Sequence, residues 1–515
     1  MPQLPQKENP KRKVKDTQRN CYGFFDKMAE SGLALGYNDV RLKTNYSSIL
    51  PKDADLAAQF SRNVSLNMPI ISAPMDTVTE AEMAIAMAQL GGLGIIHKNL
   101  SPENQASAVR KVKHKLNAFI PDPICIHASQ TVKEVLEFVK MKKYTFLSFP
   151  VLDNSDNVVG IVSSSDFKFC MDGTKKISDI MAKKMISAPI GTDISAAYKT
   201  MMTNRIKILP VFNRQKKLTG IFTLADVKRI VAGLSPDYNL APDGTLRVGA
   251  AIGVGEQAKQ RMELLANAKT DVVVIDTAHG DSAGVIDMVK HCKRHHPNID
   301  VVAGNISEPE SAKRLTEAGA DGIKVGQGPG SICTTRIIAG VGCPQVTAVY
   351  NCSKALRGSG VPVCADGGIE YSGDITIALA AGANTVMLGK LLAGTTESPG
   401  EVIFRQDKKQ VKVYRGMGSL GAMRDNKASR ERYGQASSPE DKLIPEGIES
   451  EIDFKGDVSN IVHQLLGGLR SGMGYCGAKN IADLQKTADF RRITLAGLKE
   501  SHPHGLDQVK KAPNY

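Results

Sequence analysis

Eight short apolar runs, each leading into a segment with helical periodicity, constrain the fold of this chain more than any other feature. Strand-like runs that alternate with helices predict a parallel sheet with helices on its faces, and eight of them are typical of a closed (β/α)₈ barrel. A doubly wound open sheet also alternates in this way, but no G-x-G-x-x-G opens a first β–α unit here. The runs cover residues 69–75, 93–98, 248–254, 272–277, 300–305, 322–325, 361–367 and 385–390.

The stretch between the second and third runs is far too long for one loop of a barrel, and it contains an internal repeat. The segment from Phe149-Pro-Val-Leu to Gly160-Ile-Val-Ser-Ser-Ser-Asp166 aligns with the one from Leu209 to Asp226, 60 residues later. The repeat resembles a tandem pair of CBS domains over residues 118–231, a family that binds purine nucleotides. By that resemblance Asp166 and Asp226 would contact the ribose of a regulatory nucleotide. Two other readings stay open: both aspartates cap the helices that follow them, or the pair is only a structural spacer.

A glycine-rich loop follows the sixth run and carries the most reactive side chain of the predicted site. Three glycines at positions 326, 328 and 330 allow a tight turn that exposes the backbone, and Ser331, Cys333 and Thr335 come directly after them. A cysteine on such a loop can act as a nucleophile and form a covalent intermediate. The alternative is a small buried hydrophobe, which the density of glycine and polar residues disfavours.

The composition limits the partners and the compartment. Lys and Arg total 66 against 53 Asp and Glu, an excess of 13 positive charges. Aromatic residues make up only 5% and Trp is absent, so the platforms that stack on single-stranded nucleic acid are scarce, and nucleotide phosphates are the expected anions. Nine cysteines without a C-x-x-C pair indicate a reducing compartment. No signal peptide and no apolar run of membrane-spanning length are evident, which predicts a cytoplasmic protein without a membrane partner.

The loop G-x-G-P-G-S-I-C-T-T-R, followed by A-G-V-G-x-P-Q, resembles the catalytic loop of the inosine monophosphate (IMP) dehydrogenase and guanosine monophosphate (GMP) reductase family. The resemblance extends from about residue 36 to the end of the chain. It implies a (β/α)₈ TIM barrel interrupted by the CBS pair, with Cys333 as the nucleophile. It also implies a flap over residues 412–456 that carries an Arg432-Tyr433 dyad. GMP reductases have a shorter segment there without the dyad, and this difference favours the dehydrogenase.

The activity implied is NAD-dependent oxidation of IMP to xanthosine monophosphate, a step of guanine nucleotide synthesis. Water would be activated by Arg432 with Tyr433, or by a second route through Thr335 and Glu446. An arginine is normally a poor base because it stays protonated, so this choice stays open. The alternatives are a GMP reductase that uses NADPH, and a nucleotide sensor with an inactive barrel; the intact catalytic residues disfavour the sensor.

The family resemblance also implies the ligand contacts. Aspartates and glycines at the ends of barrel strands suit ribose hydroxyls and phosphate. The expected IMP contacts are Met75, Ser331, Asp366, Gly368, Gly389, Lys390, Tyr414, Gly416, Met417, Gly418 and Glu446. The expected NAD contacts are Asp276, Asn305, Gly326 and Gly328. The expected potassium site combines Gly328, Gly330 and Cys333 of one subunit with Glu500, Ser501 and His502 of a neighbour.

The predicted organisation has four parts. Residues 1–28 form a flexible arm, residues 29–117 and 232–515 form the barrel, and residues 118–231 form the inserted regulatory pair. The shared potassium site implies a homotetramer, which could pair into an octamer. IMP, NAD and regulatory purine nucleotides are the expected partners, and nucleic acid is not expected as a primary one.

Overall fold

The computed structural model describes residues 19–115, 119–142, 144, 146–192, 194–231, 237–507 and 512–513. Two compact units make up the chain. The barrel unit holds the chain up to Val112, residues Asp237–Asn239, and the chain from Arg247 onward. The inserted unit comprises Lys113–Pro236 and Leu240–Leu246.

Eight parallel strands close the barrel, in the order β13-β14-β15-β16-β17-β18-β4-β5. Every run predicted as a barrel strand is confirmed. Because both faces of each strand are covered, the strands are built almost entirely from buried apolar residues. The strands are β4 (Ile70–Ser72), β5 (Leu93–Ile96), β13 (Gly249–Ile252), β14 (Val272–Asp276), β15 (Asp300–Ile306), β16 (Gly322–Val325), β17 (Val363–Asp366) and β18 (Thr385–Leu388).

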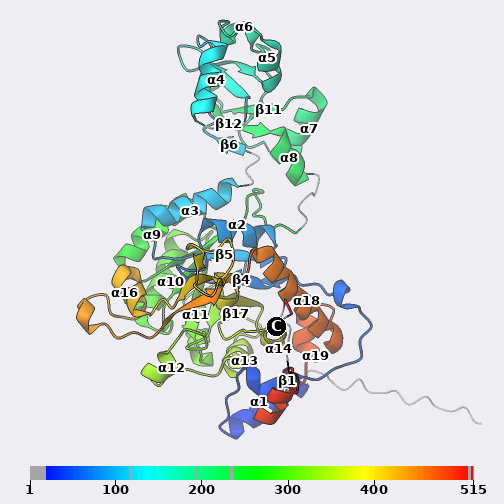
Figure 1. The fold of residues 1–515 in the computed structure, drawn as a ribbon, viewed down its shortest axis with the longest axis vertical. Helices are drawn as coiled ribbons and strands as arrows, with labels where there is room; N and C mark the ends of the chain where they lie inside the picture. Colours follow the sequence, from blue (N-terminus) through cyan, green and yellow to red (C-terminus); the bar gives the residue numbers. More distant parts are fainter. Residues whose placement is uncertain are drawn as a thin grey trace, which may run out of the picture. The chain divides into compact units, whose positions relative to one another are not determined.

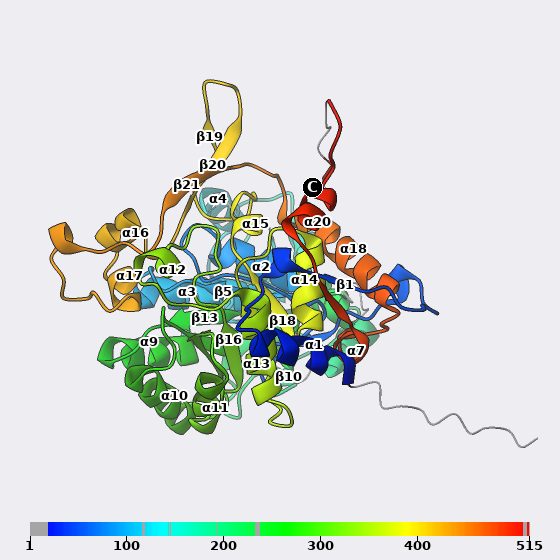
Figure 2. The same cartoon turned by 90° about the horizontal axis from the view of Figure 1, so that it is seen from below.

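Helices surround the strands, as Figures 1 and 2 show for α9, α10 and α11 in green. Helix α18 packs on α14 at Gly468 and Gly472, where a Cβ would come within 2.0 Å of the Ser372 hydroxyl and 2.6 Å of the Thr376 hydroxyl. The layer consists of α2 (Ala81–Gln89), α3 (Pro102–His114), α9 (Glu256–Asn267), α10 (Ala283–His295), α11 (Pro309–Glu317), α13 (Gln345–Ala355), α14 (Ser372–Ala380), α18 (Val458–Cys476) and α19 (Ile481–Thr487).

The amino-terminal segment is more ordered than expected. Residues Arg19–Glu30 form helix α1, and Phe25 is only 3% exposed because it stacks on Tyr350 with ring centroids 4.1 Å apart. Strand β1 (Val40–Leu42) then pairs with β22 (Phe490–Arg492). The predicted end of the flexible arm at residue 28 is therefore wrong, since aromatic packing fixes the chain earlier. Residues 1–18 lie outside the described residues.

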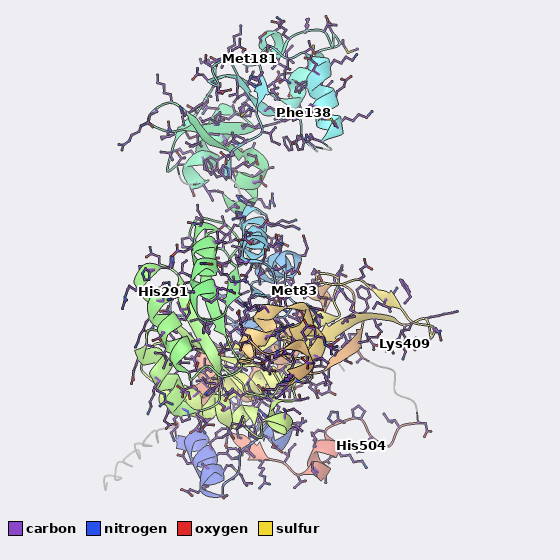
Figure 3. The ribbon with its side chains drawn as sticks, turned by 90° about the vertical axis from the view of Figure 1, so that its left-hand side faces the viewer. Met83, Phe138, Met181, His291, Lys409 and His504 are labelled. Carbon is purple, nitrogen blue, oxygen red and sulfur yellow. The ribbon has the colours of Figure 1, made fainter. Side chains whose placement is uncertain are left out.

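The inserted unit repeats one pattern of strands and helices, each copy with its own apolar core. Phe138 and Met181 both belong to the first copy (Figure 3). Its elements are β7 (Ile126–His127), α4 (Val132–Met141), β8 (Phe149–Leu152), β9 (Val158–Val162) and α5 (Ser164–Phe169), followed by α6 (Ile177–Ile180). The second copy has β10 (Ala188–Pro189), α7 (Ile194–Asn204), β11 (Ile208–Phe212), β12 (Leu218–Thr223) and α8 (Leu224–Val231), and β6 (Phe119–Pro121) pairs with β12.

The repeated aspartates hold the starts of equivalent helices. Asp166 accepts hydrogen bonds of 2.7 Å from both the backbone N–H and the hydroxyl of Ser163 at the start of α5. Asp226 accepts one of 2.6 Å from the hydroxyl of Thr223 at the start of α8. The Asp166 carboxylate thus caps the start of α5 through the Ser163 N–H, while the Asp226 carboxylate binds the Thr223 hydroxyl and Arg229 at the start of α8. A ligand role at both carboxylates is compatible with these bonds.

The segment predicted as a flap leaves the barrel as a small antiparallel sheet of β19 (Ile403–Phe404), β20 (Gln410–Arg415) and β21 (Glu449–Asp453). The β19–β20 hairpin projects away from the barrel (Figure 2). Two short helices, α16 (Leu420–Asp425) and α17 (Lys427–Arg432), lie between β20 and β21. No helix among the described residues is both long and apolar enough to cross a membrane.

Candidate active site

A cavity of about 570 Å³ opens at the carboxyl ends of the barrel strands, the end where barrels of this kind place their sites. Most of the predicted site residues meet there. Those lining it are Met75, Asp276, Asn305, Gly326, Gly328, Gly330, Ser331, Cys333, Thr335, Asp366, Gly368, Gly389, Lys390, Tyr414, Gly416, Met417, Arg432, Tyr433 and Glu446.

The cysteine loop is held by backbone pairing with the segment that returns from the flap. The Thr334 N–H donates to the carbonyl of Glu446 at 2.9 Å, and the Ile448 N–H donates to the carbonyl of Ile332 at 3.0 Å. The sulfur of Cys333 lies 3.2 Å from the hydroxyl of Thr335 and is partly accessible from the cavity. This placement fits a nucleophile with a proton-carrying neighbour and does not fit a buried packing residue.

Gly326 shows why this loop needs glycine. Its φ is +150°, and a Cβ there would lie 2.1 Å from the carbonyl oxygen of Asp366. A side chain at this position would therefore push the cysteine loop away from the end of β17.

A buried lysine that the sequence reading missed connects the two predicted ribose-binding carboxylates. Lys324 on β16 is 1% exposed, and its ammonium lies 2.9 Å from Asp276 and 2.6 Å from Asp366. The ammonium also donates to the side-chain oxygen of Asn305. The side-chain nitrogen of Asn305 in turn donates to Asp366 at 2.9 Å. The only signal in the sequence is a charged residue inside an otherwise apolar strand, and a buried charge is stable only when it is paired and hydrogen-bonded.

A second buried lysine lies on the far side of Asp276. The ammonium of Lys98 donates to the Asp276 carbonyl at 3.1 Å. Burial, together with a smaller effect of the Arg432 guanidinium, lowers the pKa of Lys98 to about 7. Asp276 therefore contacts Lys324 and Arg432 through its carboxylate and Lys98 through its backbone carbonyl.

The predicted dyad reaches the cavity from the end of α17. The Arg432 guanidinium forms an ion pair with the Asp276 carboxylate. The backbone carbonyl of Arg432 accepts a hydrogen bond from the Ala278 N–H at 3.1 Å. Burial raises the pKa of Tyr433; Arg432 opposes this rise, and Cys333 and Glu446 add to it. The dyad thus lines the same cavity as Cys333 and Glu446.

Gly418 does not line the cavity. A Cβ on Gly418 would lie 2.5 Å from the ring of Tyr433. The backbone carbonyl of Gly418 accepts a hydrogen bond from the Glu446 N–H at 3.0 Å. The position expected to contact substrate instead lies against two catalytic candidates.

The end of the cavity predicted for phosphate is formed by Tyr414, Ser331 and the turn at Gly389. The Tyr414 hydroxyl bonds to Ser331 and to the Lys390 backbone, and burial raises its pKa to about 12. The Lys390 side chain points to the rim, where it lies 3.3 Å from Glu370 and both are about half exposed. Backbone N–H groups and hydroxyls at this end are suited to an anion.

The two halves predicted for potassium lie apart within one chain. Glu500 ends α20 (Leu495–Glu500), and Ser501 and His502 line a separate cavity of about 430 Å³ between β1, α14 and α18. Within one chain, Gly328, Gly330 and Cys333 therefore line a different cavity from Ser501 and His502.

Comparison with known proteins agrees with this geometry. The family model described as IMP dehydrogenase / GMP reductase domain matches residues 34–504. An inosine-5'-monophosphate dehydrogenase of Bacillus subtilis is 46% identical over 492 residues, 95% of this chain and 99% of the relative. One from Aquifex aeolicus is 47% identical over 484 residues, 93% and 97% of the two chains.

Among solved structures, a variant of GMP reductase from Trypanosoma brucei in complex with guanosine 5'-monophosphate superposes with a TM-score of 0.81. It is 38% identical, and the match covers 93% of this chain and 99% of that one. The barrel, the cysteine loop at its mouth and these matches together lead to one conclusion. This chain belongs to the IMP dehydrogenase / GMP reductase family.

Proposed function

We propose that the chain oxidises IMP to xanthosine monophosphate with NAD, through a covalent intermediate on Cys333, in guanine nucleotide synthesis. The observation that carries the proposal is the Arg432-Tyr433 dyad, which lies in the cavity beside Cys333 and Glu446. A reductase would have no need of a group that activates water at this position. The relatives named IMP dehydrogenase that match nearly the whole chain support the same choice.

In the first step, the Cys333 thiolate forms a bond to carbon 2 of the purine. The hydride that leaves carbon 2 takes its electron pair with it, and NAD supplies the acceptor when bound. Asp366, held by Lys324 and Asn305, binds the ribose hydroxyls of IMP. Ser331, Tyr414 and the backbone at Gly368 and Gly389 bind its phosphate.

In the second step, water attacks carbon 2 and the bond to the Cys333 sulfur breaks. Arg432 would first have to give up its own proton, with Tyr433 beside it, before receiving that of the attacking water; Thr335, 3.2 Å from the sulfur, offers the second route with Glu446. Asp276 is both the proposed ribose contact of NAD and the observed partner of Arg432. The cofactor and the dyad would therefore use one carboxylate in turn, which orders the two steps.

The remaining parts of the proposal concern assembly and regulation. The carbonyl groups of Gly328, Gly330 and Cys333 would bind a potassium ion together with Glu500, Ser501 and His502 of a neighbour, since carbonyl oxygens suit such an ion. This sharing implies a homotetramer, alone or paired into an octamer. The inserted unit would act as a CBS pair that binds purine nucleotides near Asp166 and Asp226, and the enzyme would work in the cytoplasm.

The proposal is tested by following NADH absorbance with IMP and NAD, with and without potassium. We expect NADH and xanthosine monophosphate to appear together, and potassium to raise the rate. NADPH consumption with GMP, with release of ammonia and no activity on IMP, would identify a reductase instead.

Deleting residues 118–231 should leave the basal reaction intact. Strands β5 and β13 flank the insertion in sequence and pair directly, with Gly249 opposite Ile95, so barrel closure does not depend on the inserted residues. The measurement is the steady-state rate of the truncated protein, together with the response of both proteins to adenine and guanine nucleotides. A truncated protein that folds but does not turn over would contradict the separation of catalysis from regulation.

A further inference from the structure

The buried face of β20 carries a lysine that no part of the proposed chemistry uses. Side chains alternate along a strand, and Lys412 and Tyr414 point inward while Val413 between them is 41% exposed. Lys412 is only 2% exposed and is among the largest fully buried side chains of the described residues.

Two backbone carbonyls among the described residues accept hydrogen bonds from the Lys412 ammonium. It donates to Thr395 at 3.0 Å and to Ser398 at 2.6 Å, both in the turn that follows the short helix α15 (Lys390–Ala393). The hydroxyls of the same two residues donate back to Leu392 at 2.8 Å and to Ala393 at 2.6 Å. Because a buried ammonium is costly unless hydrogen-bonded, these bonds fix both the lysine and the turn.

Tyr414, the other inward side chain of β20, reaches the start of the segment whose end Lys412 binds. The Tyr414 hydroxyl bonds to the Lys390 backbone and lies 3.0 Å from the place that a Cβ on Gly389 would take. One strand therefore holds the segment from Gly389 to Ser398 at two points, and the first of these is the proposed phosphate contact.

We propose that Lys412 is a positioning residue for the substrate phosphate: by binding the Thr395 and Ser398 carbonyls, it fixes the segment whose start at Gly389 and Lys390 receives that phosphate. The inference rests on the proposed function, because it assumes that a nucleotide monophosphate binds at Gly389. Lys412 itself makes no contact with substrate.

The chemistry of the side chain makes this role specific. A lysine ammonium has three donors and full charge, so it satisfies two buried carbonyls at once. Methionine has nearly the same length but no donor, so it would leave the Ser398 carbonyl without its 2.6 Å bond from Lys412, whereas the Thr395 carbonyl would keep the 2.8 Å bond from the Ser398 hydroxyl. The segment would then relax at the phosphate end, while the purine and ribose contacts at Cys333 and Asp366 come from other strands.

The test compares the binding of IMP and of inosine, which lacks the phosphate, to wild type and Lys412→Met by titration calorimetry. Loss of a hydrogen bond to a charged group weakens an interaction by roughly 10–100-fold, so we expect the variant to lose about that factor in affinity for IMP. Inosine affinity should change by less than about twofold, and KM for IMP should rise while kcat changes little.

Two further variants make the result specific. Lys412→Gln keeps an amide donor without the charge and should fall between wild type and Lys412→Met. Lys409→Met removes an exposed lysine at the tip of the β19–β20 hairpin (Figure 3) and should match wild type. A Lys412→Met protein that melts earlier but keeps the full preference for IMP over inosine would overturn the inference, since its role would then be structural only. A wild type without that preference would overturn the proposed phosphate site, and the inference with it.

Discussion

The variant Cys333→Ala is expected to form no NADH, although it should still bind IMP with nearly wild-type affinity. The sulfur is the protein atom proposed to bond to carbon 2, so without it neither hydride loss nor hydrolysis can proceed by this route. The ribose and phosphate contacts come from Asp366, Ser331 and Tyr414, whose positions do not depend on the sulfur. Steady-state NADH absorbance and titration with IMP measure the two effects.

A matched control lies on the same loop. Cys343 is partly buried, and burial raises the pKa of its thiol to about 11, so it is a poor nucleophile at neutral pH. Cys343→Ala should retain turnover. Appreciable NADH production by Cys333→Ala would exclude covalent catalysis by this residue.

Arg432→Ala should separate the two chemical steps. Hydride loss needs Cys333 and the bound nucleotides, so a pre-steady-state burst of NADH should survive. Hydrolysis needs the dyad in the cavity, so the covalent enzyme–nucleotide should accumulate and the steady-state rate should fall by ~10²–10⁴-fold, the usual effect of removing a positioned proton-transfer group. Stopped-flow absorbance and the intact mass of quenched enzyme measure the burst and the adduct.

Lys427, at the exposed start of the same helix, provides the control: Lys427→Ala should keep both burst and steady-state rate. An Arg432→Ala protein that loses the burst and carries no adduct would place the arginine earlier in the reaction or make it only structural. Arg432→Ala also removes the ion pair with Asp276 and so frees that carboxylate for the ribose of the cofactor. The apparent KM for NAD should therefore fall in this variant.

The barrel could be predicted because each strand is a local pattern. Buried parallel strands such as Val272–Asp276 are continuous apolar runs, and their count and spacing determine the fold. Cys333 could be found for the same reason, since its loop is one contiguous motif. The Arg432-Tyr433 dyad could be predicted only from the family resemblance of the long polar segment that carries it.

What escaped prediction depends on residues far apart in the sequence. Lys324 and Lys98 become parts of the site only because Asp276 and Asp366 come to the same strand ends from other β–α units. Helix α1 is fixed by Tyr350 and Phe490, more than 300 residues away in the chain. The contact between Gly418 and Tyr433 likewise exists only once the segment has folded back.

The hydrogen bonds between the cysteine loop and residues 446–448 make these two stretches one cooperative unit of local unfolding. Neither stretch can unfold locally without the other. The free energy needed to open the cysteine loop therefore depends on residues more than 100 positions downstream. Substitutions near Glu446 will therefore alter the order of the cysteine loop even where they touch no ligand. Neither stretch can therefore be exchanged alone between related chains without loss of order in the other.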